Sequence, residues 1–108
     1  MKNKMKLFLS FALSCTVAAL PATAAVQCYD TVTEVIVHSG GRIFFTTANA
    51  CSSAWCELTG DAIFVNSGYA MLMTAKVKNK TVYFQWGTLG SCDAKNPAYT
   101  VPEFMILK

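Results

Sequence analysis

Short runs of β-branched and aromatic residues alternate with turn residues along most of the chain. Residues 31–38 (TVTEVIVH) and 42–47 (RIFFTT) are two such runs, and a Gly-Gly pair lies between them. Glycine adopts the positive φ angles of tight hairpin turns at little cost, so this pattern predicts a β-hairpin. Residues 54–59 (AWCELT) predict a third strand, with Trp55 as its large apolar residue.

The following segment has the periodicity of a helix. Its apolar residues recur at positions i, i+3, i+4 and i+8: Tyr69, Leu72, Met73 and Val77. Such a stripe predicts a helix that packs these side chains against the sheet. We expect the helix to begin with Ser67 as its N-cap and to end near Asn79, with residues 62–65 as a separate apolar extension before it.

Two more strands are predicted after the helix. Residues 81–86 alternate so that Val82, Phe84 and Trp86 share one face, with Tyr83 and Gln85 on the other. Residues 99–107 predict the last strand. It contains Pro102, which indicates an edge, a bend or a bulge.

The predicted order of elements is strand, strand, strand, helix, strand, strand. This is the order of an OB-fold, a small five-stranded and partly open barrel. A barrel hides most of the unpaired strand edges that a small β-protein would otherwise expose. The alternative is an open antiparallel sheet with the one helix packed on a face.

The first 24 residues have the three parts of a secretory signal peptide. Three lysines stand at the start, residues 7–20 are an uncharged apolar run, and Pro21 is followed by the small residues Ala-Thr-Ala. The apolar run of about 14 residues is shorter than the roughly 20 that a spanning helix needs. We therefore expect cleavage after residue 24, with residues 25–108 exported to the periplasm or secreted as one domain.

Removal of the signal changes the charge. The precursor has a net charge of +3, and the signal contains three of its nine basic residues, so residues 25–108 have six basic and six acidic side chains. A neutral chain does not attract nucleic acid or anionic membranes over its whole surface. Low net charge also permits self-association, so a homo-oligomer is compatible with the composition.

Four cysteines follow the signal: Cys28, Cys51, Cys56 and Cys92. An even number in an exported chain predicts two disulfides. In an OB barrel the first strand lies antiparallel to the fourth, so Cys28 should meet Cys92, and Cys51 should meet Cys56 across the second turn. The alternative pairs Cys28 with Cys51 and Cys56 with Cys92. A zinc site is disfavoured because no Cys-x2-Cys pair is present.

The sequence predicts no catalytic residue, cofactor or metal ligand. His38 is the only histidine after the signal, and it lies beside the expected hairpin turn. Glu57 and Asp61 are the nearest pair of acids, and they straddle a turn instead of forming the carboxylate pair of a glycosidase. We therefore expect a non-enzymatic protein.

Aromatic residues are the remaining signal for function. Strand alternation prevents Phe44 and Phe45 from both pointing inward, and the same holds for Tyr83 and Phe84. Some aromatic side chains should therefore lie outside the core, where they stack on sugars or bury in a partner. The expected binding surface consists of Phe44, Trp55, Tyr83 and Tyr99. The alternative is that these rings are covered by the helix or by the proline-containing loop.

Residues 69–84 (YAMLMTAKVKNKTVYF), an apolar helix running into a valine-containing strand, resemble a segment of the binding subunits of bacterial AB5 toxins of the subtilase-cytotoxin and pertussis-like group. They also resemble small exported OB-like proteins of unknown function in Gram-negative bacteria. The resemblance implies a glycan- or receptor-binding subunit. The alternative is a periplasmic inhibitor or immunity-type protein that binds a protein partner.

Overall fold

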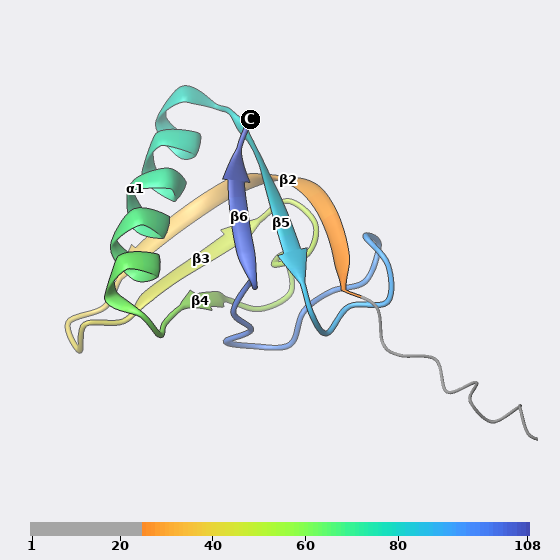
Figure 1. The fold of residues 1–108 in the computed structure, drawn as a ribbon, viewed down its shortest axis with the longest axis horizontal. Coiled ribbons are helices and arrows are strands. Elements are labelled where there is room, and N and C mark those ends of the chain that lie inside the picture. The colour runs from red at the N-terminus through yellow and green to blue at the C-terminus, as the bar shows by residue number, and fades with distance from the viewer. Residues whose placement is uncertain (1–24) are drawn as a thin grey trace, which may run out of the picture.

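The computed structural model describes residues 25–108, so the predicted signal peptide lies outside the described residues. The elements occur in the order β2 (Val26–Val37), β3 (Ile43–Thr47), β4 (Cys56–Leu58), α1 (Ala62–Lys78), β5 (Thr81–Trp86) and β6 (Phe104–Leu107). The strands form one five-stranded antiparallel sheet in the spatial order β4-β3-β2-β5-β6 (Figure 1).

Strand β2 is the centre of the sheet and makes it curl. Its first half pairs with β5, its second half pairs with β3, and the register shifts between Val32 and Glu34. A bulge of this kind bends a strand and increases its twist, and Figure 1 shows β2 curving across the molecule. The sheet is therefore a curled half-barrel, and the order of elements confirms the predicted OB-like arrangement.

Backbone hydrogen bonds bridge the open side of the half-barrel. Strands β4 and β6 stand at the two edges of the sheet. The Tyr99 N–H donates to the Trp55 carbonyl oxygen (2.6 Å), and the Glu57 N–H donates to the Thr100 carbonyl oxygen (2.9 Å). The segment that leads into β4 and the segment that leads towards β6 are thus held side by side.

Aromatic rings fill the core between the sheet and α1. Phe84 stacks on Phe45 at 5.7 Å between ring centroids and on Trp86 at 5.2 Å. From α1, Leu72 and Ala75 are buried in the same cluster. Phe84, Trp86 and Val82 all point inward, which confirms the alternation predicted for residues 81–86.

The helix begins earlier than the sequence pattern predicted. Asp61, not Ser67, is the N-cap, and its carboxylate accepts hydrogen bonds from the backbone N–H groups of Ile63 (2.7 Å) and Phe64 (3.4 Å). The predicted apolar extension at residues 62–65 is therefore the first turn of α1. The predicted end is confirmed, because Asn79 is the C-cap in a left-handed conformation with a φ of 54°.

The predicted buried stripe of the helix is only partly right. Leu72 is fully buried and Tyr69 is half-buried, but Met73 is 37% exposed and Val77 is 76% exposed. Apolar side chains occur around the whole circumference of α1, so their spacing does not select one face. The prediction was wrong for Met73 and Val77.

Small residues, not large ones, occupy much of the sheet-facing side of α1. An added Cβ at Gly68 would lie 3.0 Å from Leu58 Cδ1 of β4 and 3.5 Å from Met105 Cε of β6. Gly68 and Ala75, both buried, therefore let the helix approach the sheet closely. A prediction of the buried face from large apolar side chains alone does not include these two positions.

Strand lengths also differ from the prediction. β2 starts at Val26, so Cys28 lies within it, and β4 starts at Cys56, after Trp55. The last strand starts at Phe104 and not at residue 99, because the preceding residues form the bridging loop and Pro102 has no N–H to donate. The predicted hairpin between β2 and β3 is confirmed: the His38 N–H donates to the Arg42 carbonyl oxygen (2.8 Å).

Both disulfides have the predicted pairing, Cys28 with Cys92 and Cys51 with Cys56. The first ties β2 to the loop that follows β5, and the second closes the short loop before β4. Two disulfides in a small domain are typical of an oxidising, extracellular environment. No helix within residues 25–108 is long and apolar enough to cross a membrane.

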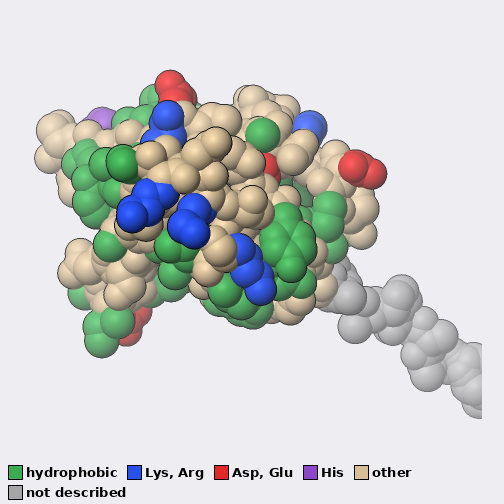
Figure 2. Space-filling model, turned by 90° about the horizontal axis from the view of Figure 1, so that it is seen from above, with side chains coloured by type: hydrophobic (Ala, Val, Ile, Leu, Met, Phe, Trp, Pro, Cys, Tyr) green, Lys and Arg blue, Asp and Glu red, His purple; other side chains and the backbone are tan. Residues whose placement is uncertain are grey.

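Lysine side chains gather at one end of the molecule. Lys76 and Lys78 lie in the last turn of α1, and Lys80 follows the helix cap. The backbone N–H of Lys108 donates to the Thr81 carbonyl oxygen (3.0 Å), so the C-terminus lies beside them. Figure 2 shows this end of the molecule, with basic side chains among hydrophobic ones.

Candidate functional site

Three of the four aromatic residues predicted for the binding surface lie together. The Phe44 ring stacks on Trp55 with 5.2 Å between centroids and 28° between planes, and it lies 5.5 Å from the Tyr99 ring. The Arg42 guanidinium lies over Phe44 (4.6 Å) and over Tyr99 (5.0 Å). We call these four residues the Trp55 cluster. Phe44 lies in β3 and Arg42 immediately precedes that strand, while Trp55 and Tyr99 lie in the two segments that bridge the half-barrel.

Within the Trp55 cluster, the rings differ in exposure. Phe44 is 3% exposed, whereas Trp55 is 43% exposed and Tyr99 is 50% exposed. Phe44 alternates with the core residue Phe45 and so points away from the core, but the other rings cover it. Phe44 is therefore the buried ring against which Trp55 and Tyr99 pack, and those two rings are exposed to solvent.

An ion pair fixes the arginine of the cluster. Arg42 Nη2 donates to Glu57 Oε1 (2.8 Å) and Arg42 Nε donates to Glu57 Oε2 (3.0 Å). These hydrogen bonds hold the pKa of the Glu57 carboxyl below its usual value against the opposing effect of burial. They also raise the pKa of the Arg42 guanidinium. Sequence reasoning missed this pair because 15 residues separate its members.

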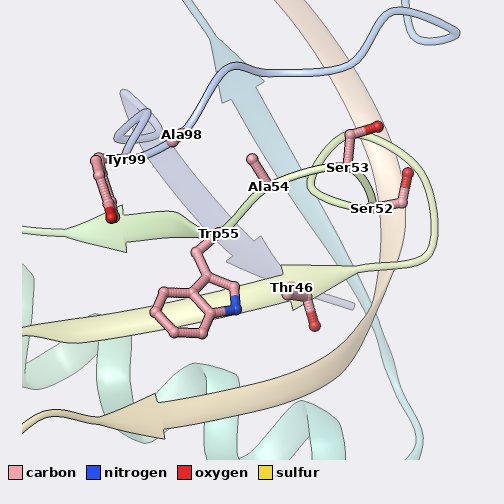
Figure 3. Close-up of a pocket in the computed structure, with 7 residues that line it drawn as sticks. All are labelled: Thr46, Ser52, Ser53, Ala54, Trp55, Ala98 and Tyr99. Carbon is pink, nitrogen blue, oxygen red and sulfur yellow. The ribbon is translucent and has the colours of Figure 1, made fainter.

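A pocket of about 330 Å³ lies beside the exposed rings (Figure 3). Its lining residues are Thr46, Ser52, Ser53, Ala54, Trp55, Ala98 and Tyr99. We call this the Trp55 pocket. Figure 3 shows the indole nitrogen of Trp55 on the side turned towards Thr46, with the two serines on the loop above. Aromatic faces and hydroxyl groups thus surround one space.

The buried carboxylate of Asp30 organises the loop that carries the serines. Asp30 Oδ2 accepts from the Thr47 hydroxyl (2.7 Å) and from the Ala50 N–H (2.9 Å), and Oδ1 accepts from the Asn49 N–H (3.1 Å). The Cys51–Cys56 disulfide closes the loop immediately afterwards. Asp30 is a positioning residue that the sequence did not reveal, because its partners lie 17 to 20 residues away.

The backbone of Tyr99 is strained. Its φ is 66°, in the left-handed region that residues other than glycine rarely adopt. The hydrogen bond from its N–H to the Trp55 carbonyl oxygen holds it there, and the Thr100 hydroxyl donates to the Pro97 carbonyl oxygen (2.9 Å) in the same turn. Strained residues gather at ligand sites, so this feature and the pocket point to the same place.

Tyr83, the fourth predicted residue, lies elsewhere, 4.5 Å from Tyr29 between ring centroids. Lys108 Nζ lies over both rings, at 5.6 Å from Tyr83 and 5.9 Å from Tyr29. We call these three residues the Tyr29 cluster. The Tyr83 hydroxyl donates to Gln27 Oε1 (2.7 Å), and no residue of this cluster lines the Trp55 pocket.

Each of the three side chains considered for catalysis forms hydrogen bonds with a different partner in the structure. His38 Nδ1 accepts from the Gly40 N–H (3.0 Å) within the hairpin turn. Glu57 pairs with Arg42, and Asp61 caps α1. Within residues 25–108 no group of three or more His, Cys, Asp or Glu side chains is arranged to hold a metal ion.

No protein-family model, no curated protein and no solved structure matches this chain.

Proposed function

We propose that the protein is an exported, non-enzymatic binding module whose Trp55 pocket takes a glycan. The observation that carries this proposal is the position of two exposed rings, Trp55 and Tyr99, beside the hydroxyl groups of Ser52, Ser53 and Thr46. A sugar ring has an apolar C–H face and a rim of hydroxyl groups. An aromatic ring covers the first, and hydroxyls donate to and accept from the second.

The environment of the protein supports this proposal. The predicted signal peptide directs the chain out of the cytoplasm, and two disulfides are typical of exported domains. Glycans are abundant on cell surfaces and outside the cell. The resemblance of residues 69–84 to toxin binding subunits favours the same kind of ligand.

The pocket is small and open, so we expect weak binding of single sugars. A volume of about 330 Å³ is at the lower end for ligand sites. At roughly 0.3 kcal/mol for each of about 12 non-hydrogen atoms, a hexose binds with about −3.6 kcal/mol, a Kd of about 2 mM. Useful affinity then requires several sites on one surface or several copies of the protein.

A glycan array followed by fluorescence titration tests the proposal. The protein, displayed in multivalent form, should bind a defined set of glycans on the array. The soluble ligand should then change the fluorescence of Trp55, whereas Trp86 is fully buried and provides a constant background.

Matched variants locate the site. Trp55→Ala and Tyr99→Ala should each abolish array binding, while Tyr29→Ala, which removes an even more exposed ring from the other cluster, should leave it intact. Failure of the wild-type protein to bind any glycan would refute the proposal. Equal loss in all three variants would mean that the site is not the Trp55 pocket.

A second candidate is a periplasmic inhibitor or immunity-type protein that binds a protein partner. The outward side of α1 favours it, because the apolar side chains of Ile63, Met73 and Val77 are exposed there. Contiguous exposed apolar surface is typical of protein interfaces.

Cross-linking in intact cells, followed by mass spectrometry of the covalent adduct, tests this second candidate. A defined adduct that disappears in the Ile63→Lys/Val77→Lys double variant, while glycan binding persists, would support a protein partner. A wild-type protein that forms no adduct would dismiss this candidate.

A further inference from the structure

We propose that the Trp55 pocket selects uncharged sugars and discriminates against acidic ones such as uronic acids. This inference rests on the proposed function, since it concerns the ligand class of the same pocket. It depends on three features of the site: an uncharged lining, a cation that is already paired, and a carboxylate at the rim.

The lining of the pocket has no charge at neutral pH. Its seven residues have hydroxyl, aromatic and methyl side chains, and none of them is Asp, Glu, Lys, Arg or His. Proteins that bind carboxylates normally place an arginine or lysine against them. None of the seven lining residues supplies such a group.

Arg42 is the cation that the Trp55 cluster contains, and Glu57 neutralises it. Two of the guanidinium nitrogens donate to the two oxygens of one carboxylate, and the flat guanidinium lies against the rings of Phe44 and Tyr99. An acidic ligand would have to displace Glu57, which is nearly buried, to obtain the same contacts. The pair therefore presents no net charge to the pocket.

Glu34 places a negative charge at the rim. Its carboxylate Oε1 accepts from the hydroxyl of Thr46, a lining residue, at 3.4 Å, and the Thr46 hydroxyl also lies 2.6 Å from that of Thr33. Glu34 is exposed and forms no ion pair within residues 25–108. An anionic sugar in the pocket would be repelled by this group, whereas an uncharged sugar would not.

Hydroxyl and N–H groups remain to recognise an uncharged ring. The Ser52 hydroxyl already donates to the Asn49 carbonyl oxygen (2.8 Å) and the Thr46 hydroxyl is engaged as described above. The hydroxyls of Ser53 and Tyr99 and the indole N–H of Trp55 have no hydrogen-bond partner within the described chain. One face of the indole packs on Phe44, which leaves the opposite face for the C–H face of a pyranose.

A matched pair of ligands tests the inference on the wild-type protein. A methyl hexopyranoside and the corresponding methyl hexuronoside differ only in replacing a CH2OH group by a carboxylate. The two ligands therefore share their shape and their stacking face. In titrations at low ionic strength the uronoside should bind at least about five-fold more weakly, the effect of one close like charge in water. Added salt should bring the ratio of the two dissociation constants closer to one, because it screens the repulsion.

Two charge-reversal variants locate the cause. Glu34→Lys should remove or invert the preference for the uncharged member of the pair. Glu103→Lys makes the same change of charge at a residue that bonds Gln85 on β5 and does not line the pocket, and it should retain the wild-type ratio. The same change of ratio in both variants would show that overall charge, and not the rim carboxylate, sets the preference.

The outcomes separate the two proposals. If the wild-type protein binds the uronoside as tightly as the uncharged sugar, or more tightly, then the selectivity is wrong while glycan binding in the pocket stands. If an array shows no glycan binding and neither ligand changes the Trp55 signal at tens of millimolar, then the proposed function itself fails. A preference for the uncharged sugar that Glu34→Lys leaves unaltered would overturn the role of Glu34.

Discussion

Two aromatic clusters lie on the face of the sheet that points away from the core, and the Trp55 cluster borders a pocket that no residue of the Tyr29 cluster lines. The Trp55 cluster joins Phe44 of β3 to two loops, and its two exposed rings, Trp55 and Tyr99, line the pocket. The Tyr29 cluster joins residues of β2, β5 and the C-terminus, which are neighbours on one regular sheet. Loops create the concavity that regular strands do not.

The polar groups around the two clusters differ in the same way. Beside Tyr83, side chains satisfy one another in a chain of hydrogen bonds from the Tyr83 hydroxyl through Gln27 and Gln85 to Glu103. Beside Trp55, hydroxyl groups line an open space: those of Thr46 and Ser52 bond within the chain, whereas that of Ser53 does not. The number of exposed aromatic rings therefore does not identify a ligand site. An exposed ring together with polar groups that lack internal partners is the better criterion.

The largest expected difference in stability is between loss of the buried ring of the Trp55 cluster and loss of an exposed ring of the Tyr29 cluster. Phe44→Ala removes a buried ring beneath Trp55 and Tyr99, and we expect a loss of about 3–5 kcal/mol in the free energy of unfolding. Tyr29→Ala removes an exposed ring, and we expect a change within about 1 kcal/mol. Chemical denaturation measures both. A loss below about 1 kcal/mol for Phe44→Ala would mean that the Trp55 cluster is not packed as described.

Removing the Cys28–Cys92 disulfide, which begins at the β2 residue next to Tyr29, should lower stability without affecting the pocket. Cys28 and Cys92 are 64 residues apart, and chain entropy for such a loop corresponds to about 4 kcal/mol. Denaturation of the Cys28→Ser/Cys92→Ser variant should show this loss, while the folded fraction should retain glycan binding. If circular dichroism shows the variant to be folded and it nevertheless fails to bind glycan, then the Trp55 pocket depends on the Cys28–Cys92 disulfide, contrary to the prediction.

Removing the Cys51–Cys56 disulfide should affect glycan binding more than it affects stability. Cys51 and Cys56 are only five residues apart, so chain entropy corresponds to about 2 kcal/mol. They bracket the loop that positions Ser52, Ser53 and Trp55, so Cys51→Ser/Cys56→Ser should weaken glycan binding far more than it weakens the fold. Titration of the folded variant decides this, and unchanged affinity would show that Asp30 alone holds the loop.

Much of the fold was predictable, because it depends on local patterns. The Gly-Gly hairpin, the alternation in β5 and the order of elements follow from neighbouring residues. The disulfide pairing followed from the predicted antiparallel contact between the first and fourth strands, which the register of β2 with β5 confirms. Residue periodicity failed where the helix is apolar on all sides, and Met73 and Val77 were therefore assigned to the wrong face.

The site was less predictable, because long-range contacts build it. Strand alternation indicated that Phe44 points away from the core, but it did not indicate that Trp55 and Tyr99 cover it. Asp30 and Glu57 looked like ordinary surface acids, and their roles depend on partners in other elements. In β2 the buried Asp30 alternates with the buried residues Cys28 and Val32, but the predicted strand started at residue 31, so this alternation was not recognised.

The smallest expected effect concerns pH. Because Arg42 lowers the pKa of Glu57 in the folded protein, the pair contributes stability above the ordinary carboxyl pKa, and this contribution is lost as the pH falls through the lowered value. The fluorescence of Trp55, taken as the difference between wild type and Trp55→Phe, should be constant from pH 7 to pH 5 and change only below about pH 4. Glu57→Gln should abolish that change, and a pH-dependent change that survives in this variant would show that the Arg42–Glu57 pair is not its cause.

Nuclear magnetic resonance of the labelled protein tests the central claim most directly, since the chain has only two tryptophans and their indole N–H signals report on separate places. Trp55 borders the pocket and Trp86 is fully buried. On addition of an uncharged methyl hexopyranoside, we predict that the Trp55 indole signal and the backbone signals of Ser53 and Tyr99 move with one saturation curve, while those of Trp86 and Tyr29 remain fixed. Shifts confined to Tyr29, Tyr83 and the residues of β6, with no movement at Trp55, would contradict the account.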